Sequence, residues 1–153
     1  MDEPLRILVV EARYYEAISD ALLEGAGQAL KAFGAEFDVV TVPGAFELPA
    51  AIAFADEAAR GASGARYDGY VALGCVIRGE TTHYDYVCGE SARGLMNLSV
   101  EKRLCIGYGV LTVEDEDQAW ARARVSEGDK GGFAARVCLD MVALKRRLHG
   151  QTR

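Results

Sequence analysis

Short apolar runs alternate along the chain with longer segments in which apolar residues recur every three or four positions. Runs of this length, bounded by glycine, proline or polar residues, predict buried β-strands. They cover residues 7–10, 37–42, 67–73 and 104–111. Because a segment with helical spacing follows each run, the pattern predicts that a helix connects each strand to the next.

The segments with helical spacing carry signals for their own ends. They predict helices that end before Gly34, begin near Pro49, span 86–98, begin with Glu114–Glu116 in the first turn and follow Gly131–Gly132. Proline is tolerated in the first turn of a helix and glycine favours its C-terminal end, so Pro49 and Gly34 support two boundaries. In the last helix the spacing predicts a buried face formed by Phe133, Val137, Met141, Leu144 and Leu148.

Strands that alternate with helices over this length predict a parallel sheet covered by helices on both faces. We therefore expect an α/β fold, namely a three-layer α/β/α sandwich with a four-stranded parallel sheet, doubly wound in the flavodoxin-like manner. A chain of 153 residues fits one compact domain. We expect this single domain to span residues 1–153, with its core over about 6–148.

Composition narrows the classes of partner. The net charge of −6 argues against nucleic acid and against an anionic membrane surface. No apolar stretch approaches the ~20 residues that span a bilayer, and the acidic N-terminus does not resemble a targeting segment. The four cysteines, Cys75, Cys88, Cys105 and Cys138, show no C-x-x-C spacing. We interpret them as reduced thiols and expect a cytoplasmic protein.

Three predicted strands end in loops that carry aromatic and ionisable residues. Tyr14 follows the first strand, Phe46 and Glu47 follow the second, and Gly74–Tyr86, which contains Arg78, Glu80, Thr81 and His83, follows the third. The carboxyl ends of parallel strands meet at one edge of a sheet, so Tyr14, Phe46, Glu47 and His83 could converge there. Rings beside a carboxylate suit a flat heterocycle with N–H donors. Taken singly, each residue has an alternative: a ring that covers the core, an acid at a helix start, or a surface histidine.

A fourth cluster lies late in the chain. Arg122, Arg124 and Lys130 stand beside Gly131–Gly132, where the last helix is expected to begin. Cations beside free helix N–H groups predict a site for phosphate or another anion, although the G-x-x-x-x-G-K-[ST] pattern of a P-loop is absent. A solvated charged turn is the alternative interpretation.

Together these residues resemble a known family, the 6,7-dimethyl-8-ribityllumazine synthases of riboflavin biosynthesis. The matching motifs are VPGAFELP at 42–49, ALGCVIRGETTHYDYV at 72–87, GYGVLTVE at 107–114 and GDKGGFAA at 128–135. The motif at 72–87 is the most specific, and the resemblance runs from about Ile7 to Leu148.

The resemblance implies a transferase that uses neither cofactor nor metal. The family condenses 5-amino-6-(D-ribitylamino)uracil with 3,4-dihydroxy-2-butanone 4-phosphate and releases phosphate and water. This is the penultimate step of riboflavin biosynthesis. The implied partners are two small-molecule substrates, and the chain is expected to form a homo-oligomer with sites at its subunit interfaces.

The resemblance also implies a role for each matching position. Those implied to hold the ribitylaminouracil are Tyr14, Ala45, Phe46, Glu47, Cys75, Val76, Ile77 and Tyr108. Those implied to hold the butanone phosphate are Glu80, Thr81, Arg122 and Lys130. His83 matches the proton-transfer residue, and imidazole titrates in the pH range where Schiff-base formation and phosphate elimination need protons moved.

Some positions depart from the family pattern. Tyr14–Tyr15 replaces the common Phe-Asn, Tyr108 replaces phenylalanine, Asp129 replaces asparagine, and Ser126 replaces a frequent lysine. The implied assembly is a pentamer or an assembly of pentamers, and the short segment before Leu5 makes the shell of sixty subunits the weaker expectation.

Two other functions compete with synthesis. One is a catalytically weak paralogue that keeps a pocket for flavin or lumazine; His83, Arg122 and Lys130 argue against it. The other is a doubly wound signalling or nucleotide-binding module, which is favoured by the fold alone. That module is disfavoured because the chain lacks both an acidic cluster after the first strand and a G-x-G-x-x-G motif.

Overall fold

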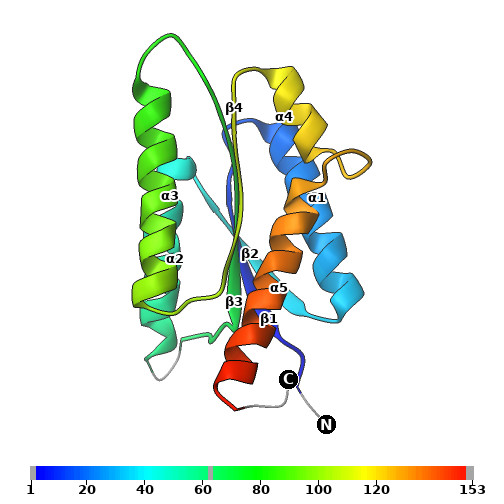
Figure 1. The fold of residues 1–153 in the computed structure, drawn as a ribbon, viewed down its shortest axis with the longest axis vertical. Coiled ribbons are helices and arrows are strands. Elements are labelled where there is room, and N and C mark those ends of the chain that lie inside the picture. Colours follow the sequence, from blue (N-terminus) through cyan, green and yellow to red (C-terminus); the bar gives the residue numbers. More distant parts are fainter. Residues whose placement is uncertain (1–2, 62–63, 151–153) are drawn as a thin grey trace.

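The computed structural model describes residues 3–61 and 64–150 (Figure 1). Its strands are β1 (Arg6–Ala12), β2 (Glu36–Val42), β3 (Gly69–Ile77) and β4 (Ile106–Val113). Its helices are α1 (Glu16–Phe33), the 3-10 helix η1 (Ala45–Glu47), α2 (Leu48–Ala59), α3 (His83–Glu101), α4 (Glu116–Ala123) and α5 (Lys130–Leu148). The predicted α/β fold is confirmed, while residues 1–2 and 151–153 of the expected domain lie outside the described part.

The four strands form one parallel sheet in the order β2-β1-β3-β4. The two central strands are apolar on both faces, and Val9 and Val71 are fully buried. At one edge, β2 leaves Val39 and Val40 exposed by 40% and 41%. This order places the carboxyl ends of β1, β2 and β3 side by side.

Helices cover both faces of the sheet, as predicted (Figure 1). Alternate residues of β1 point to opposite faces, which is the two-residue period of a strand. Leu8 and Val10 pack with residues of α2 and α3, whereas Ile7 and Val9 pack with residues of α1, α4 and α5. The pattern of the chain therefore builds two apolar cores, one on each side of the sheet.

Two predicted helix boundaries are confirmed. Gly34 adopts a left-handed conformation with a φ of 89°, and its N–H donates to the carbonyl oxygens of Leu30 and Lys31 at the end of α1. Pro49 lies in the first turn of α2. Glycine reaches a positive φ without strain, and proline lacks only an N–H that the first turn does not use.

The predicted buried face of α5 is wrong. Its members are partly or mostly exposed: Val137 and Leu144 partly, Phe133 by 51%, Met141 by 44% and Leu148 by 73%. The buried face is formed instead by small residues with two larger ones, namely Gly131, Gly132, Ala134, Ala135, Cys138, Leu139 and Val142. A Cβ atom on Gly131 would collide with the backbone carbonyl of Leu22 in α1. Close approach to α1 thus selects the small residues, and the large apolar ones remain on the outside.

Candidate active site

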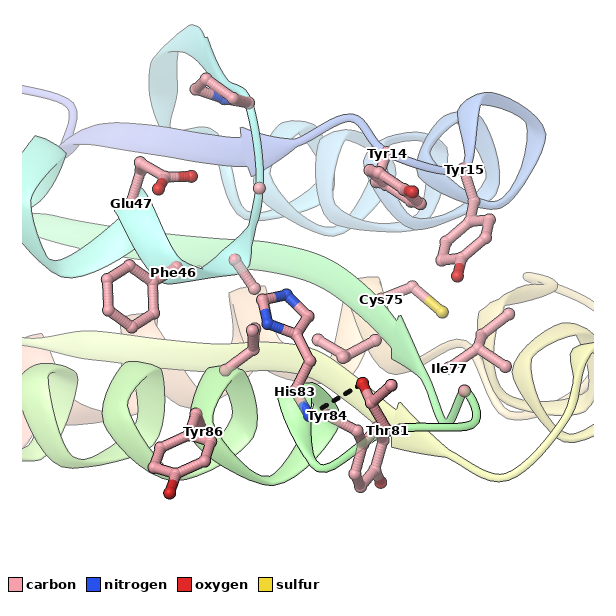
Figure 2. Close-up of a pocket in the computed structure, with 16 residues that line it drawn as sticks. Tyr14, Tyr15, Phe46, Glu47, Cys75, Ile77, Thr81, His83, Tyr84 and Tyr86 are labelled. Atoms are coloured by element: carbon pink, nitrogen blue, oxygen red, sulfur yellow. Dashed lines mark hydrogen bonds between the residues drawn. The ribbon is translucent and has the colours of Figure 1, made fainter.

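A cavity of about 750 Å³ opens at the carboxyl ends of β1, β2 and β3 (Figure 2). Its walls are the loop after β1, the segment through η1, the end of β3 and the start of α3. The residues predicted for the site that line it are Tyr14, Ala45, Phe46, Glu47, Cys75, Val76, Ile77, Thr81 and His83. The predicted convergence of Tyr14, Phe46, Glu47 and His83 at one edge of the sheet is confirmed.

Aromatic side chains form the mouth of this cavity. The rings of Tyr14 and Tyr15 meet edge to face with their centroids 4.9 Å apart. Tyr14 is 73% exposed and Phe46 is 54% exposed, so neither ring is a plug of the core. Because their faces are free, these rings can stack on a flat ligand.

Glu47, the residue after Phe46, supplies a carboxylate to the cavity. It is the last residue of η1 and precedes α2 directly, and its side chain is exposed. Its own backbone N–H donates to the carbonyl oxygen of Gly44, which closes the turn after β2. The turn therefore presents a hydrogen-bond acceptor beside the Phe46 ring (Figure 2).

The floor of the cavity is the end of β3, which is longer than the sequence predicts. The strand continues through Cys75 and Val76 to Ile77, so the loop does not begin at Gly74. Parallel pairing with β4, up to the pair Ile77 and Val113, extends the strand. Burial raises the pKa of the Cys75 thiol to about 11, which keeps the thiol neutral at physiological pH.

His83 is the first residue of α3, which begins three residues earlier than the predicted Tyr86. The His83 N–H donates to Oγ1 of Thr81 over 3.3 Å, and this bond orders the turn into the helix. The imidazole is exposed and is directed from the start of α3 toward η1 (Figure 2). The imidazole thus lines the same cavity as the Phe46 ring and the Glu47 carboxylate.

The other charged groups of this loop lie away from the cavity. The Arg78 guanidinium lies 3.1 Å from the Glu114 carboxylate and 3.6 Å from that of Asp85, and it covers the Tyr84 ring at 4.3 Å. Its backbone N–H donates to Val113, so Arg78 ties the loop to β4. Glu80 is exposed and is not among the residues that line the cavity.

Three further predicted residues, Tyr108 on β4, Arg122 on α4 and Lys130 on α5, line a different hollow. Tyr108, Arg122 and Lys130 line a space of about 250 Å³ together with Phe133. Arg122 donates to the carbonyl oxygen of Gln118 over 3.0 Å, and the Lys130 ammonium lies 5.2 Å from the centre of the Phe133 ring. Within residues 3–61 and 64–150, neither cation forms a salt bridge with a carboxylate. The β4 hollow, as we call this space, therefore offers two unneutralised positive charges.

The start of α5 differs from the predicted anion site. The helix begins at Lys130, and the Asp129 carboxylate accepts a hydrogen bond from the Gly132 N–H over 3.2 Å. One helix N–H is thus occupied by the chain's own acid. Arg124 pairs with Glu127 at 3.2 Å and does not line the hollow. Of the three predicted cations, Arg122 and Lys130 line the hollow.

Sequence reasoning missed several residues that line the cavity, namely Tyr15, Pro43, Gly44, Gly79, Tyr84, Tyr86 and Val87. Most lie within two residues of a predicted position, so adjacency to the three strand ends was the available signal. Tyr84 lies in the first turn of α3, which begins before the predicted Tyr86.

Other kinds of site are not found in the part of the chain that the structure describes. No cluster of three or more histidine, cysteine, aspartate or glutamate side chains there could hold a metal ion. None of the helices described is long and apolar enough to cross a membrane.

Comparisons with known proteins all point to one family. The family model described as 6,7-dimethyl-8-ribityllumazine synthase matches residues 4–146. The 6,7-dimethyl-8-ribityllumazine synthase 1 of Rhizobium meliloti is 62% identical over 147 residues, which cover 95% of each chain. The synthase of Agrobacterium fabrum is 58% identical over 150 residues, which cover 98% of this chain and 100% of the relative. That of Bartonella tribocorum is 59% identical over 141 residues, which cover 92% and 90%.

Proposed function

The chain belongs to the 6,7-dimethyl-8-ribityllumazine synthase family, and from this membership we infer that it makes 6,7-dimethyl-8-ribityllumazine. The substrates are 5-amino-6-(D-ribitylamino)uracil and 3,4-dihydroxy-2-butanone 4-phosphate. The enzyme is a transferase of riboflavin biosynthesis that acts without a cofactor. The observation that carries the assignment to this cavity is the convergence of free aromatic faces, a carboxylate and one imidazole at the ends of three parallel strands.

We propose that the cavity binds the ribitylaminouracil. Tyr14 and Phe46 would stack on or flank the pyrimidine, and Glu47 would accept hydrogen bonds from the ring or the ribityl chain. Backbone groups of Cys75, Val76 and Ile77, beside Ala45, would contact the uracil edge. The neutral thiol of Cys75 suits a wall that only packs against the ligand.

His83 would transfer protons during the condensation. Schiff-base formation removes water, and elimination of phosphate removes a proton from carbon, so each step needs an acid or a base near neutral pH. The imidazole lines the cavity proposed for the ribitylaminouracil. The Thr81 hydroxyl, which is already bonded to the His83 N–H, and Glu80 would lie at the phosphate end.

The phosphate would be held by Arg122 and Lys130. Their lack of carboxylate partners within the described residues supports this role, because an anion can then be their counter-ion. In one chain, however, these cations line the β4 hollow and not the cavity. We therefore propose that each active site joins the cavity of one subunit to the β4 hollow, with Tyr108, of a neighbour.

The oligomer would be a pentamer or an assembly of pentamers. The exposed apolar side chains on the outer face of α5, namely Phe133, Met141 and Leu148, support an interface, because patches of this kind are uncommon on monomers. The four free cysteines support a reducing, cytoplasmic location.

Incubation of the purified protein with both substrates tests the function, with product formation followed by lumazine fluorescence. Appearance of 6,7-dimethyl-8-ribityllumazine is expected, and the mass of the native assembly should be a multiple of five subunits. Riboflavin or lumazine binding without any product would contradict synthesis and favour the weak paralogue.

A further inference from the structure

Arg13 directly precedes Tyr14 in the chain and is not among the residues that line the cavity. Its Nε donates to Oε2 of Glu11 over 2.9 Å, and its two terminal nitrogens lie 2.7 Å from carboxylate oxygens of Glu16 and Asp20. One guanidinium therefore contacts three carboxylates. Glu11 is on β1, whereas Glu16 and Asp20 are on α1, so the contacts connect the end of a strand to the start of the next helix.

Glu11 anchors this arrangement inside the protein. Its side chain is 5% exposed, and the same Oε2 atom that accepts from Arg13 accepts from the Thr41 hydroxyl on β2 over 2.9 Å. The Arg13 backbone N–H also donates to the carbonyl oxygen of Val42 at the end of β2. Arg13 thus connects the ends of β1 and β2, the two strands whose following loops carry Tyr14 and Phe46.

The two residues that follow Arg13 are the tyrosines of the cavity mouth. Tyr14 is 73% exposed, so packing in the core does not determine where its ring lies. Tyr15 is the N-cap residue of α1, and its side chain makes no capping hydrogen bond. The Tyr15 ring is partly buried against the core, whereas the position of the exposed Tyr14 ring depends on the backbone on either side of it. Arg13 is bonded to the strand on one side of Tyr14 and to α1 on the other.

We propose that Arg13, anchored by the buried Glu11, is a positioning residue that sets the aromatic wall on which the ribitylaminouracil ring stacks. This inference rests on the proposed function. A lysine would keep the positive charge that the buried Glu11 carboxylate needs, but a single ammonium cannot reproduce the planar fork that reaches three carboxylates. The wall should shift while the fold remains.

The variant Arg13→Lys tests the proposal by steady-state kinetics with each substrate varied in turn. The KM for the ribitylaminouracil and the Kd for the lumazine product should both rise about tenfold, since small misplacements of binding groups are costly. The KM for the butanone phosphate should stay unchanged, because its cations lie in the separate β4 hollow.

Arg6→Lys is the matched control. Arg6 is on the same strand, and its guanidinium also contacts β2, 2.9 Å from the Asp38 carboxylate. It is the first residue of β1, however, and so lies at the opposite end of the strand from the cavity. It should leave both KM values at the wild-type level. Equal kinetics for the two variants would overturn the proposal, and so would a parallel rise of both KM values in Arg13→Lys.

A second variant covers the case in which Arg13→Lys does not fold. Glu16→Gln with Asp20→Asn changes only the exposed partners, at 73% and 71% exposure, and keeps the buried Glu11 contact. It should raise the same KM by a smaller factor, and no change would overturn the proposal. If the wild type makes no lumazine, the proposed function fails. Positioning is then judged by lumazine affinity, which Arg13→Lys should weaken relative to Arg6→Lys.

Discussion

Two impaired variants of this chain should regain activity when they assemble together. This follows if each active site joins the cavity of one subunit to the β4 hollow of the next. The first variant, Phe46→Ala with Glu47→Gln, disables the cavity and leaves the hollow intact. The second, Arg122→Ala, disables the hollow and leaves the cavity intact.

The loss in each variant follows from the contacts removed. Stacking of a base on an aromatic ring is worth ~1–3 kcal/mol, and a hydrogen bond to a charged group is worth ~1.5–3 kcal/mol. At ~1.4 kcal/mol per factor of ten, Arg122→Ala should lower kcat/KM for the butanone phosphate roughly 10- to 140-fold. The cavity variant loses both kinds of contact and should fall roughly 10²- to 10⁴-fold.

The recovery expected in mixed oligomers can be worked out from the arrangement. In a closed ring every interface is the same, so each site pairs one cavity with one neighbouring hollow. With equal amounts of the two variants assembled at random, about one quarter of the sites combine an intact cavity with an intact hollow. The mixture should therefore reach about one quarter of wild-type activity, well above either variant alone.

The assay is lumazine formation by co-expressed variants, with native mass spectrometry to verify that the oligomers are mixed. A mixture of Arg122→Ala with Lys130→Ala is the control. Both of these residues lie in the same hollow, so no combination of subunits restores a complete site. Mixed oligomers of the cavity and hollow variants that stay inactive, or equal recovery in the control, would refute the shared site.

Three further predictions concern single residues. His83→Ala should lower kcat modestly, by less than Arg122→Ala lowers kcat/KM for the butanone phosphate, and added imidazole should restore part of the rate in the same assay. Cys75, whose pKa burial raises to about 11, should resist alkylation by iodoacetamide at pH 8. The neutral form of this thiol stabilises the fold below about pH 9, and this contribution should be lost as the pH rises toward 11. Mass mapping of alkylation against pH checks the direction and the range of this pKa shift. Gly131→Ala should cost ~1–3 kcal/mol of unfolding free energy in denaturant titrations, because its Cβ would meet the backbone of α1. Gly89→Ala on α3, with no atom within 4 Å of its added Cβ, should not destabilise.

The sequence predicted the elements and failed on which face of a helix is buried. Short apolar runs and the signals at Gly34 and Pro49 depend on neighbours within a few residues, so they can be recognised in the chain itself. The burial of Gly131 depends on the approach of α5 to α1. Helical spacing of apolar residues predicts that large side chains form the core. Close contact between two helices instead requires small residues such as glycine.

The same distinction between local sequence and tertiary packing applies to the residues of the candidate site. By itself the sequence determined the fold class, the family, and the set of aromatic and ionisable residues at the ends of three strands. The order of strands in the sheet then brought Tyr14, Phe46 and His83 to one cavity. The tertiary structure decided that Arg122 and Lys130 line a separate hollow within one chain, because α4, which carries Arg122, and the start of α5, which carries Lys130, meet beside β4. Motif order along a chain carries no information about which surface a residue faces, since that depends on packing between elements distant in sequence.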